Sequence, residues 1–309
     1  MLLTKSLSGE YLTIYSKFGI NPFTLSEASE ILKKEQNQLR KDMHILKKSF
    51  SLVSVGRGKY RSVEPEKWIG IAGFLDWFPS LSPLFERLSP YISAIDGIFL
   101  YGSRARGDFR EDSDFDLLVL TGDSKAKQRI KRIGEGFTDV TLEVFLTQKI
   151  EETMGLDPVF LTAALREATP VFGTGLKGHF LKIRPKKAAL IAALDLGVKR
   201  LLDWKVFLRE GLDQIIAGDI LRAIFLRIRQ AFLTKMLLTG GAGYNYVMLD
   251  EFSNYFGDKK RLLELYEIYR AVRDDREIPK FPLPSKEELE KLFAGAEEYI
   301  RDTRKSIAS

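Results

Sequence analysis

The fold of the central part of this chain is decided by the stretch YGSRARGDFREDSDFDL, residues 101–117. An apolar run over 95–102 precedes it and DSDFDLLVL, residues 112–120, closes it, so the sequence predicts a strand, a turn and a second strand. Gly102 lets the backbone approach a ligand closely, and Gly107 lets the chain turn back. The N–H groups of such a turn, with the Ser103 hydroxyl, suit phosphate oxygens. The stretch therefore predicts a phosphate-binding turn.

Two acidic residues follow the turn at a spacing typical of a metal site. Asp114 and Asp116 are two residues apart on the second strand, so alternation directs both carboxylates to one face. Adjacent carboxylates repel each other unless a cation lies between them, and Mg²⁺ or Mn²⁺ is the natural occupant. A third strand, residues 139–147, offers Asp139 and Glu143 on the face opposite its apolar positions. Either acid could complete a metal-assisted phosphoryl-transfer site and orient or deprotonate a nucleophile.

The pattern G-S-x3-G-x5-S-D-x-D-L resembles the signature of the DNA polymerase β-like nucleotidyltransferase superfamily, and most of all its minimal nucleotidyltransferase members. The resemblance covers about residues 84–175. It implies that an NMP group is moved from an NTP, such as ATP, with Mg²⁺ or Mn²⁺ as cofactor. Residues expected at the nucleotide are Gly102, Ser103, Arg104 and Gly107. Those expected to bind metal and act in catalysis are Asp114, Asp116 and Glu143, although members of the superfamily often have aspartate at the third position and Asp139 stays an alternative.

The first 65 residues predict helix, helix, helix and hairpin, which is the order of a winged helix-turn-helix. Thr24 and Glu27 have the spacing of a capping box at the start of the second helix. The excess of positive charge is concentrated here, with 11 Lys or Arg against 6 Asp or Glu, and favours a polyanionic partner.

The third helix and the hairpin carry the side chains expected to bind DNA. Amide and guanidinium groups near a helix N-terminus read base edges, whereas lysines and the arginines of a wing suit phosphates. The predicted DNA-binding residues are Gln36, Asn37, Gln38, Arg40, Lys41, Lys47, Arg57, Lys59 and Arg61. A protein-interaction module and an RNA-binding module remain alternatives for this segment.

Composition sets the outer limits of these hypotheses. With 309 residues, 45% of them hydrophobic and 29% charged, the chain is expected to be globular with two or three domains. The absence of cysteine excludes disulfides, thiolate zinc sites and a cysteine nucleophile. No apolar run is long enough to span a bilayer and the N-terminus lacks the apolar segment of a signal peptide, so a cytoplasmic location and no membrane partner are expected.

The predicted fold is α+β and multidomain. We expect a winged helix over 1–65, a nucleotidyltransferase domain with a mixed sheet over 66–180, including a connector at 66–83, and a C-terminal helical bundle over 181–309. Tyr266, Tyr269, Arg270 and Arg273 in this last part are candidates for acceptor contacts if they are exposed. The segment 173–178 matches G-x-G-x-x-G but lacks the βαβ context of a dinucleotide site, so we expect an interdomain loop, from which Lys177 could line the nucleotide cleft.

Three functional hypotheses follow. The leading one is a metal-dependent nucleotidyltransferase acting on a hydroxyl of a protein, RNA or small molecule, with a winged helix that binds DNA. The second is a transcription regulator whose nucleotidyltransferase domain is inactive and senses NTP. The third is an antitoxin-like module that neutralises a helical toxin partner. Winged-helix DNA binders are often dimers, so a homodimer is compatible with the first two.

Overall fold

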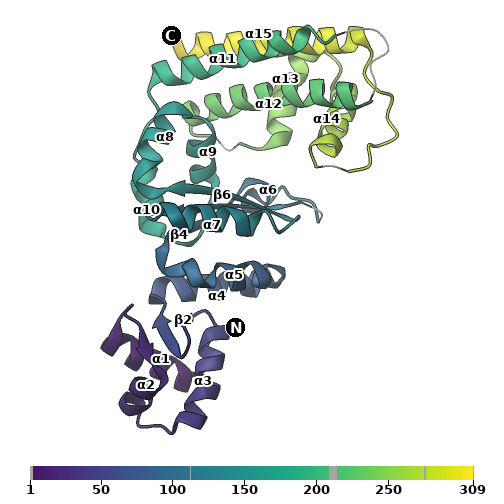
Figure 1. Ribbon diagram of the computed structural model, residues 1–309. Coiled ribbons are helices and arrows are strands. Elements are labelled where there is room, and N and C mark those ends of the chain that lie inside the picture. The colour runs from purple at the N-terminus through teal and green to yellow at the C-terminus, as the bar shows by residue number, and fades with distance from the viewer. Residues whose placement is uncertain (1–2, 112, 209–213, 242, 275, 309) are drawn as a thin grey trace. The chain divides into compact units, whose positions relative to one another are not determined.

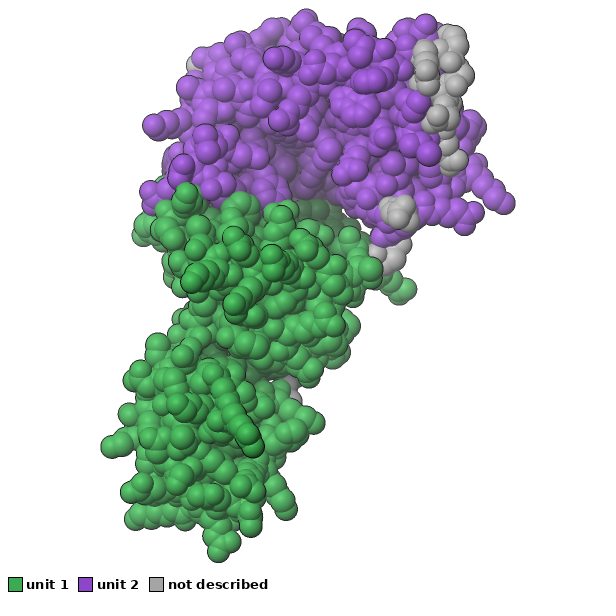
Figure 2. Space-filling model, in the orientation of Figure 1, with its two compact units in different colours: residues 1–150, 168–182 green, residues 151–167, 183–309 purple. Residues whose placement is uncertain are grey.

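The computed structural model describes residues 3–111, 113–208, 214–241, 243–274 and 276–308 (Figure 1). They form an α+β structure that is mostly helical and contains a mixed four-stranded sheet. The chain divides into two compact units, coloured separately in Figure 2: residues 1–150 with 168–182, and residues 151–167 with 183–309.

The N-terminal segment of the first unit contains the predicted helices and hairpin. Its elements in order are α1 (Lys5–Phe18), β1 (Phe23–Thr24), α2 (Leu25–Leu32), α3 (Gln36–Lys48), β2 (Leu52–Gly56) and β3 (Lys59–Ser62). The short strand β1 was not predicted; it pairs with β3, and the sheet order is β1-β3-β2. The predicted capping box is confirmed, because Glu27 N–H donates to Thr24 Oγ1 (3.3 Å) and Thr24 N–H donates to Glu27 Oε2 (2.7 Å).

The rest of the first unit is built around the four-stranded sheet. Its elements are α4 (Pro65–Trp77), η1 (Pro79–Leu81), α5 (Ser82–Leu88), η2 (Ser89–Ala94), β4 (Ile95–Tyr101), α6 (Gly102–Arg106), β5 (Phe115–Thr121), α7 (Ser124–Gly134), β6 (Val140–Leu146), η3 (Thr147–Lys149), β7 (Thr169–Phe172) and α10 (Thr174–Phe180). The strand order is β6-β5-β4-β7, with β5 and β6 parallel and the other pairs antiparallel. The three strands predicted from the sequence are β4, β5 and β6.

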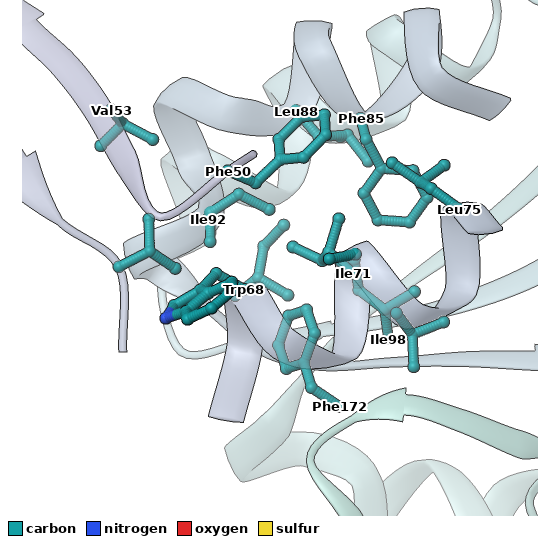
Figure 3. Packing of buried hydrophobic residues seen from close by; sticks show 14 of the residues in the cluster. Phe50, Val53, Trp68, Ile71, Leu75, Phe85, Leu88, Ile92, Ile98 and Phe172 are labelled. Atoms are coloured by element: carbon teal, nitrogen blue, oxygen red, sulfur yellow. The ribbon is translucent and has the colours of Figure 1, made fainter. Parts of the chain in front are cut away.

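One hydrophobic core joins the N-terminal helices to this sheet. Its buried residues form one connected cluster, whose members include Leu7 of α1 and Phe172 of β7. Figure 3 shows Phe50, Trp68 and Phe85 directed into the same packed region. The Tyr11 hydroxyl reinforces this junction by donating to the Val63 carbonyl at 2.5 Å, and burial raises the pKa of that hydroxyl.

The helix α4 makes its contact with the sheet through a glycine. A Cβ on Gly70 would lie only 2.0 Å from the Val171 carbonyl oxygen of β7. The backbones of α4 and β7 therefore approach at a distance that no other residue permits. Trp68 and Ile71, on the neighbouring turns of α4, are buried in the shared core.

The expectation of an interdomain loop at 173–178 is wrong. Gly173 has φ of +85° and caps α10, which follows β7 directly. A Cβ on Gly173 would meet the Gly97 Cα at 2.8 Å, so this glycine permits the chain to leave the sheet edge and begin a helix. The Lys177 Nζ donates to the Ala168 carbonyl, and burial lowers the pKa of this amine.

The second unit is helical, as expected for the C-terminal part. Its elements are α8 (Ile150–Leu156), α9 (Phe160–Glu167), α11 (Lys187–Lys205), α12 (Gln214–Thr239), α13 (Asn245–Phe256), α14 (Lys259–Arg273) and α15 (Lys286–Ala308). Phe225, Phe252 and Tyr299 lie at the centre of its own core. Among the described residues, no helix combines the length and the apolar character that crossing a membrane requires.

The shared core yields a stability prediction. Phe50 is 6% exposed and packs edge-on against Phe85, with ring centroids 6.3 Å apart, although its φ of +62° is unfavourable for an aromatic residue. Phe50→Ala should therefore cost about 3–5 kcal/mol of unfolding free energy. Trp77→Ala is the matched control, because Trp77 is 83% exposed and its loss should cost less than about 0.5 kcal/mol. Urea denaturation followed by circular dichroism measures both, and equal effects would contradict the shared core.

Candidate functional site

The shape of the turn between β4 and β5 depends on the close packing of a glycine against a carboxylate. Gly102 is the first residue of α6 and has φ of +74°. A Cβ built on it would lie 2.1 Å from Asp116 Oδ2 and 3.0 Å from Asp116 Cγ. Position 102 therefore requires glycine for two reasons, the left-handed backbone and the space that the Asp116 side chain fills.

The register of the sheet determines which acidic residues share a face. Asp116 is paired with Tyr101 of β4 on one side and with Thr141 of β6 on the other. Glu143 is paired with Leu118, so it is displaced from Asp116 by one strand, about 4.8 Å, and by two residues, about 7 Å. Asp116, Thr141 and Glu143 thus belong to one face of the sheet. Asp114 lies just before β5, two residues from Asp116, so the alternation of the strand places it on that face as well.

The two candidates for a third carboxylate differ in exposure. Asp139 precedes β6, is exposed, and its carbonyl accepts the Phe115 N–H at 2.9 Å. Glu143 lies within β6 and is half-buried. Within the described ranges, which leave out Asp112, no group of three or more acidic or histidine residues is arranged to hold a metal ion.

The loop that carries Asp114 is fastened by Arg104. Its Nε and Nη2 donate to the Ser113 carbonyl at 2.9 and 2.6 Å, and Nη2 also donates to the Glu111 carbonyl at 3.2 Å. The guanidinium lies over the Phe115 ring, 3.9 Å from its centroid, and 5.0 Å from that of Phe109. Arg104 therefore contacts the residues on both sides of Asp114, a role that was not predicted from the sequence.

The rest of the turn is closed by backbone hydrogen bonds. The Ser103 carbonyl accepts the N–H of Gly107, which has φ of +81°, and of Asp108 at 3.1 Å. The Ser113 hydroxyl accepts the Arg110 N–H at 2.9 Å, which shapes the return of the chain towards Asp114. Ser103 is half-buried and Gly107 is exposed. A Cβ on Gly107 would meet nothing within 4 Å, in contrast to Gly102.

The predicted DNA-binding side chains of the N-terminal segment fall into two groups. All of those on α3 are exposed, and so are Arg57 and Lys59 on the hairpin; the α3 residues are Gln36, Asn37, Gln38, Arg40, Lys41 and Lys47. Arg61 differs, because it is half-buried and its Nη1 donates to Ser93 Oγ at 3.0 Å. Arg61 thus tethers the hairpin to η2.

Two of the candidates for acceptor contacts are ruled out by burial. Tyr266 is 6% exposed and Tyr269 is 3% exposed, and both pack against Phe225 in the core of the second unit. Burial also raises the pKa of Tyr266. The regular spacing of these tyrosines along α14 reflects core packing.

A turn, a carboxylate packed against its glycine and a further acid on the adjoining strand β6 are the features expected of a nucleotidyltransferase site. A family model described as the nucleotidyltransferase domain matches residues 81–157. A protein of Methanocaldococcus jannaschii named "Putative protein adenylyltransferase" is 34% identical over 71 residues, which are 21% of this chain and 72% of that protein. The chain belongs to this family, and it is a nucleotidyltransferase.

A solved structure, that of a nucleotidyltransferase-like protein from Exiguobacterium sibiricum 255-15, was also matched. It is 14% identical, and the match covers 72% of this chain and 75% of the other, with a TM-score of 0.31. At that TM-score the two backbones are too different for structural details to be transferred.

The glycine packed against Asp116 gives a prediction with an internal control. Gly102→Ala should displace the Asp116 carboxylate and lower nucleotidyl transfer about 100-fold or more, because misplacement by about 1 Å has that effect. Gly58→Ala, in the N-terminal hairpin, imposes similar left-handed strain in open space and should cost only about 1 kcal/mol of stability with little change in kcat. Equal losses of transfer in the two variants would refute the argument.

Arg104 gives a second prediction, which separates two uses of its charge. If it positions Asp114 through the loop, Arg104→Gln should lower kcat about 10- to 100-fold and leave the KM for NTP nearly unchanged. If it contacts nucleotide phosphates instead, as the sequence analysis expected, KM should rise strongly. Steady-state transfer rates over a range of NTP concentrations distinguish the two outcomes.

Proposed function

We propose that this chain transfers an NMP group from an NTP to a hydroxyl group of an acceptor and releases pyrophosphate. Asp114 and Asp116 would bind the catalytic divalent metal, and Glu143 would act on the acceptor hydroxyl. Gly102 and Ser103 would hold the nucleotide phosphates. The observation that carries the proposal is the packing of Gly102 against Asp116, which lies inside the matched segment 81–157.

The donor set is compatible with Mg²⁺ or Mn²⁺. Mg²⁺ is commonly bound by one or two carboxylates together with substrate phosphates and water, and does not need a cage made of protein alone. Asp114 and Asp116 supply two hard oxygen donors beside the turn expected to hold the phosphates. When bound there, the metal would neutralise charge on the phosphates and lower the pKa of a coordinated hydroxyl.

The residues of the chain would divide the remaining work. The acceptor oxygen forms a bond to the α-phosphorus, the bond from that phosphorus to the pyrophosphate oxygen breaks, and the hydroxyl proton passes to a carboxylate. Glu143 suits this last role because it shares a face with Asp116 and is half-buried beside the predicted metal-binding residues. Arg104 would keep Asp114 in place through Ser113.

The name of the M. jannaschii relative supports a protein acceptor and ATP as the donor. The match covers 71 residues, which are 21% of this chain, so RNA and a small molecule stay alternatives for the acceptor. We place the protein hydroxyl first because it is the acceptor class to which the name of a relative points.

The carboxylates give the decisive prediction for this function. Asp114→Asn and Asp116→Asn should each reduce transfer at least about 1,000-fold, because a neutral amide is a poor ligand for a hard cation. Glu143→Gln should also abolish most transfer, whereas Asp139→Asn should remain near the wild-type rate. Transfer of label from each of the four α-³²P NTPs to lysate proteins, with Mg²⁺ or Mn²⁺, measures all four variants.

The outcomes separate the rival hypotheses. Label that appears on protein and disappears with Asp114→Asn supports the transferase, and its resistance to ribonuclease excludes an RNA acceptor. Loss with Asp139→Asn but not with Glu143→Gln would exchange the roles of these acids. No label with any NTP, in a protein that still binds DNA, would favour the NTP-sensing regulator.

DNA binding by a winged helix is the second function that we propose, for the N-terminal segment. The order of α1, α2, α3 and the β1-β3-β2 sheet agrees with that class. The predicted base-reading and phosphate-binding side chains of α3 are all exposed, and the acid Asp42 on the same helix is paired with Lys34 Nζ at 3.0 Å. Lys34 is bonded further to Glu10, and these carboxylates raise its pKa. The positive charge on the outer face of α3 is therefore little neutralised by acidic side chains of the same helix.

The hairpin provides the test of this second function. Arg57→Gln with Lys59→Gln should reduce the salt dependence of duplex DNA binding by about two phosphate contacts. Arg61→Gln should leave that dependence unchanged, because Arg61 is engaged with Ser93. Fluorescence anisotropy of a labelled duplex over a salt series measures both, and no binding at low salt would remove the winged-helix proposal.

A further inference from the structure

The helix α7 carries an unbalanced positive charge that the nucleotidyl transfer site does not explain. Its 11 residues, SKAKQRIKRIG, include five basic side chains and no acidic one. Within the described chain, these five side chains form no ion pair or hydrogen bond, and the Arg129 guanidinium lies over a tyrosine ring. The helix α14, which also carries an excess of basic residues, instead pairs Arg261 with Glu264 and Glu288. The charges on α7 are therefore not neutralised by acidic residues of the described chain.

The position of α7 removes it from the catalytic face. Gly134 of α7 packs on Leu142 of β6, since a Cβ on Gly134 would lie 2.8 Å from the Leu142 Cβ. Leu142 alternates with Glu143, so α7 covers the face opposite to that of Asp116 and Glu143. Its charge is thus not arranged to hold the triphosphate. Figure 1 shows α7 running along the sheet above α5, which it contacts.

The basic side of α7 is connected to the hairpin through η2. Arg61 of β3 donates to Ser93 of η2, and β2 also contacts η2. On its other side, η2 contacts α7, where the Arg129 guanidinium lies over the half-buried Tyr91 ring at 6.0 Å. Lys125, Arg129 and Arg132 follow one another at helical spacing along this flank of α7, and all three are exposed.

We propose that α7 and the β2–β3 hairpin form one phosphate-binding ridge, which contacts the backbone of a DNA duplex beyond the segment held by α3. The ridge is defined by Arg57, Lys59, Lys125, Arg129 and Arg132. Charge complementarity points to a polyanion, and the guanidinium groups of arginines suit a phosphodiester backbone. The hairpin and α7 both pack into the core that includes Leu7 and Phe172, so the elements that carry these charges are held together. This inference rests on the proposed binding of DNA by the N-terminal segment.

The two flanks of α7 supply a matched pair of variants. Arg129→Gln with Arg132→Gln removes two charges on the η2 side, and Lys127→Gln with Lys131→Gln removes two from elsewhere on the same helix. Glutamine preserves helix propensity in both. The full chain is titrated with a fluorescein-labelled DNA duplex from about 50 to 200 mM salt, with an RNA duplex of the same sequence as the second arm. Circular dichroism verifies that each variant is folded.

The ridge predicts that the arginine pair lowers the slope of log affinity against log salt by about 2 and weakens binding about tenfold at 100 mM salt. The lysine pair should change the slope by less than about half as much. Equal effects of the two pairs, or none from the arginine pair while Arg40→Gln still weakens binding, would overturn the ridge and leave the DNA-binding proposal intact. No binding of DNA by the wild-type chain, or binding of RNA alone, would overturn both.

Discussion

The approach of Gly102 to the Asp116 carboxylate is the constraint on which the rest of the site depends. β4 and β5 are antiparallel, and Tyr101 is paired with Asp116, so the chain leaves β4 at the point where the acid enters β5. The acid can lie there because residue 102 has no side chain and can adopt φ of +74°. A turn suited to phosphates and a carboxylate suited to a cation are thereby fixed next to each other by backbone geometry. The parallel pairing of β5 with β6 then adds Glu143 to the same face.

Arg104 is a charged residue of this turn that stabilises the backbone around it. Arg104 lies two residues after Gly102, where a contact with phosphate would be a natural expectation. Its Nε and Nη2 donate to the carbonyls of Glu111 and Ser113, and its guanidinium lies over the rings of Phe109 and Phe115. Guanidinium groups combine hydrogen bonding in a plane with stacking, which lysine cannot do. Glu111, Ser113 and Phe115 therefore contact a cation that belongs to the protein.

Local patterns in the sequence were sufficient for the parts of the fold that depend on neighbouring residues. The capping box of Thr24 and Glu27, the strands on either side of the turn and the helices of the C-terminal part all follow from short-range spacing. The partners of Arg104 and Arg61 could not be predicted, because their hydrogen bonds depend on how a loop returns and on how η2 meets the hairpin. The same limit explains Tyr266 and Tyr269, whose helical spacing is equally compatible with a surface stripe and a core.

The shared core changes what the charge distribution means. Along the sequence, the excess of positive charge lies in the first 65 residues. The five basic residues of α7 do not show in this sum, because acidic residues elsewhere after residue 65 balance them. Electrostatic fields act through space over about 10 Å at moderate salt, so the relevant neighbours are those brought together by folding. In the first unit, η2 contacts both the hairpin and α7, and all three pack around one core. The net charge of this packed region is therefore more positive than the net charge counted over residues 66–309 suggests. A candidate surface for a polyanion must therefore be identified from the packed elements, and this is why the proposed ridge includes α7 on the back of the sheet.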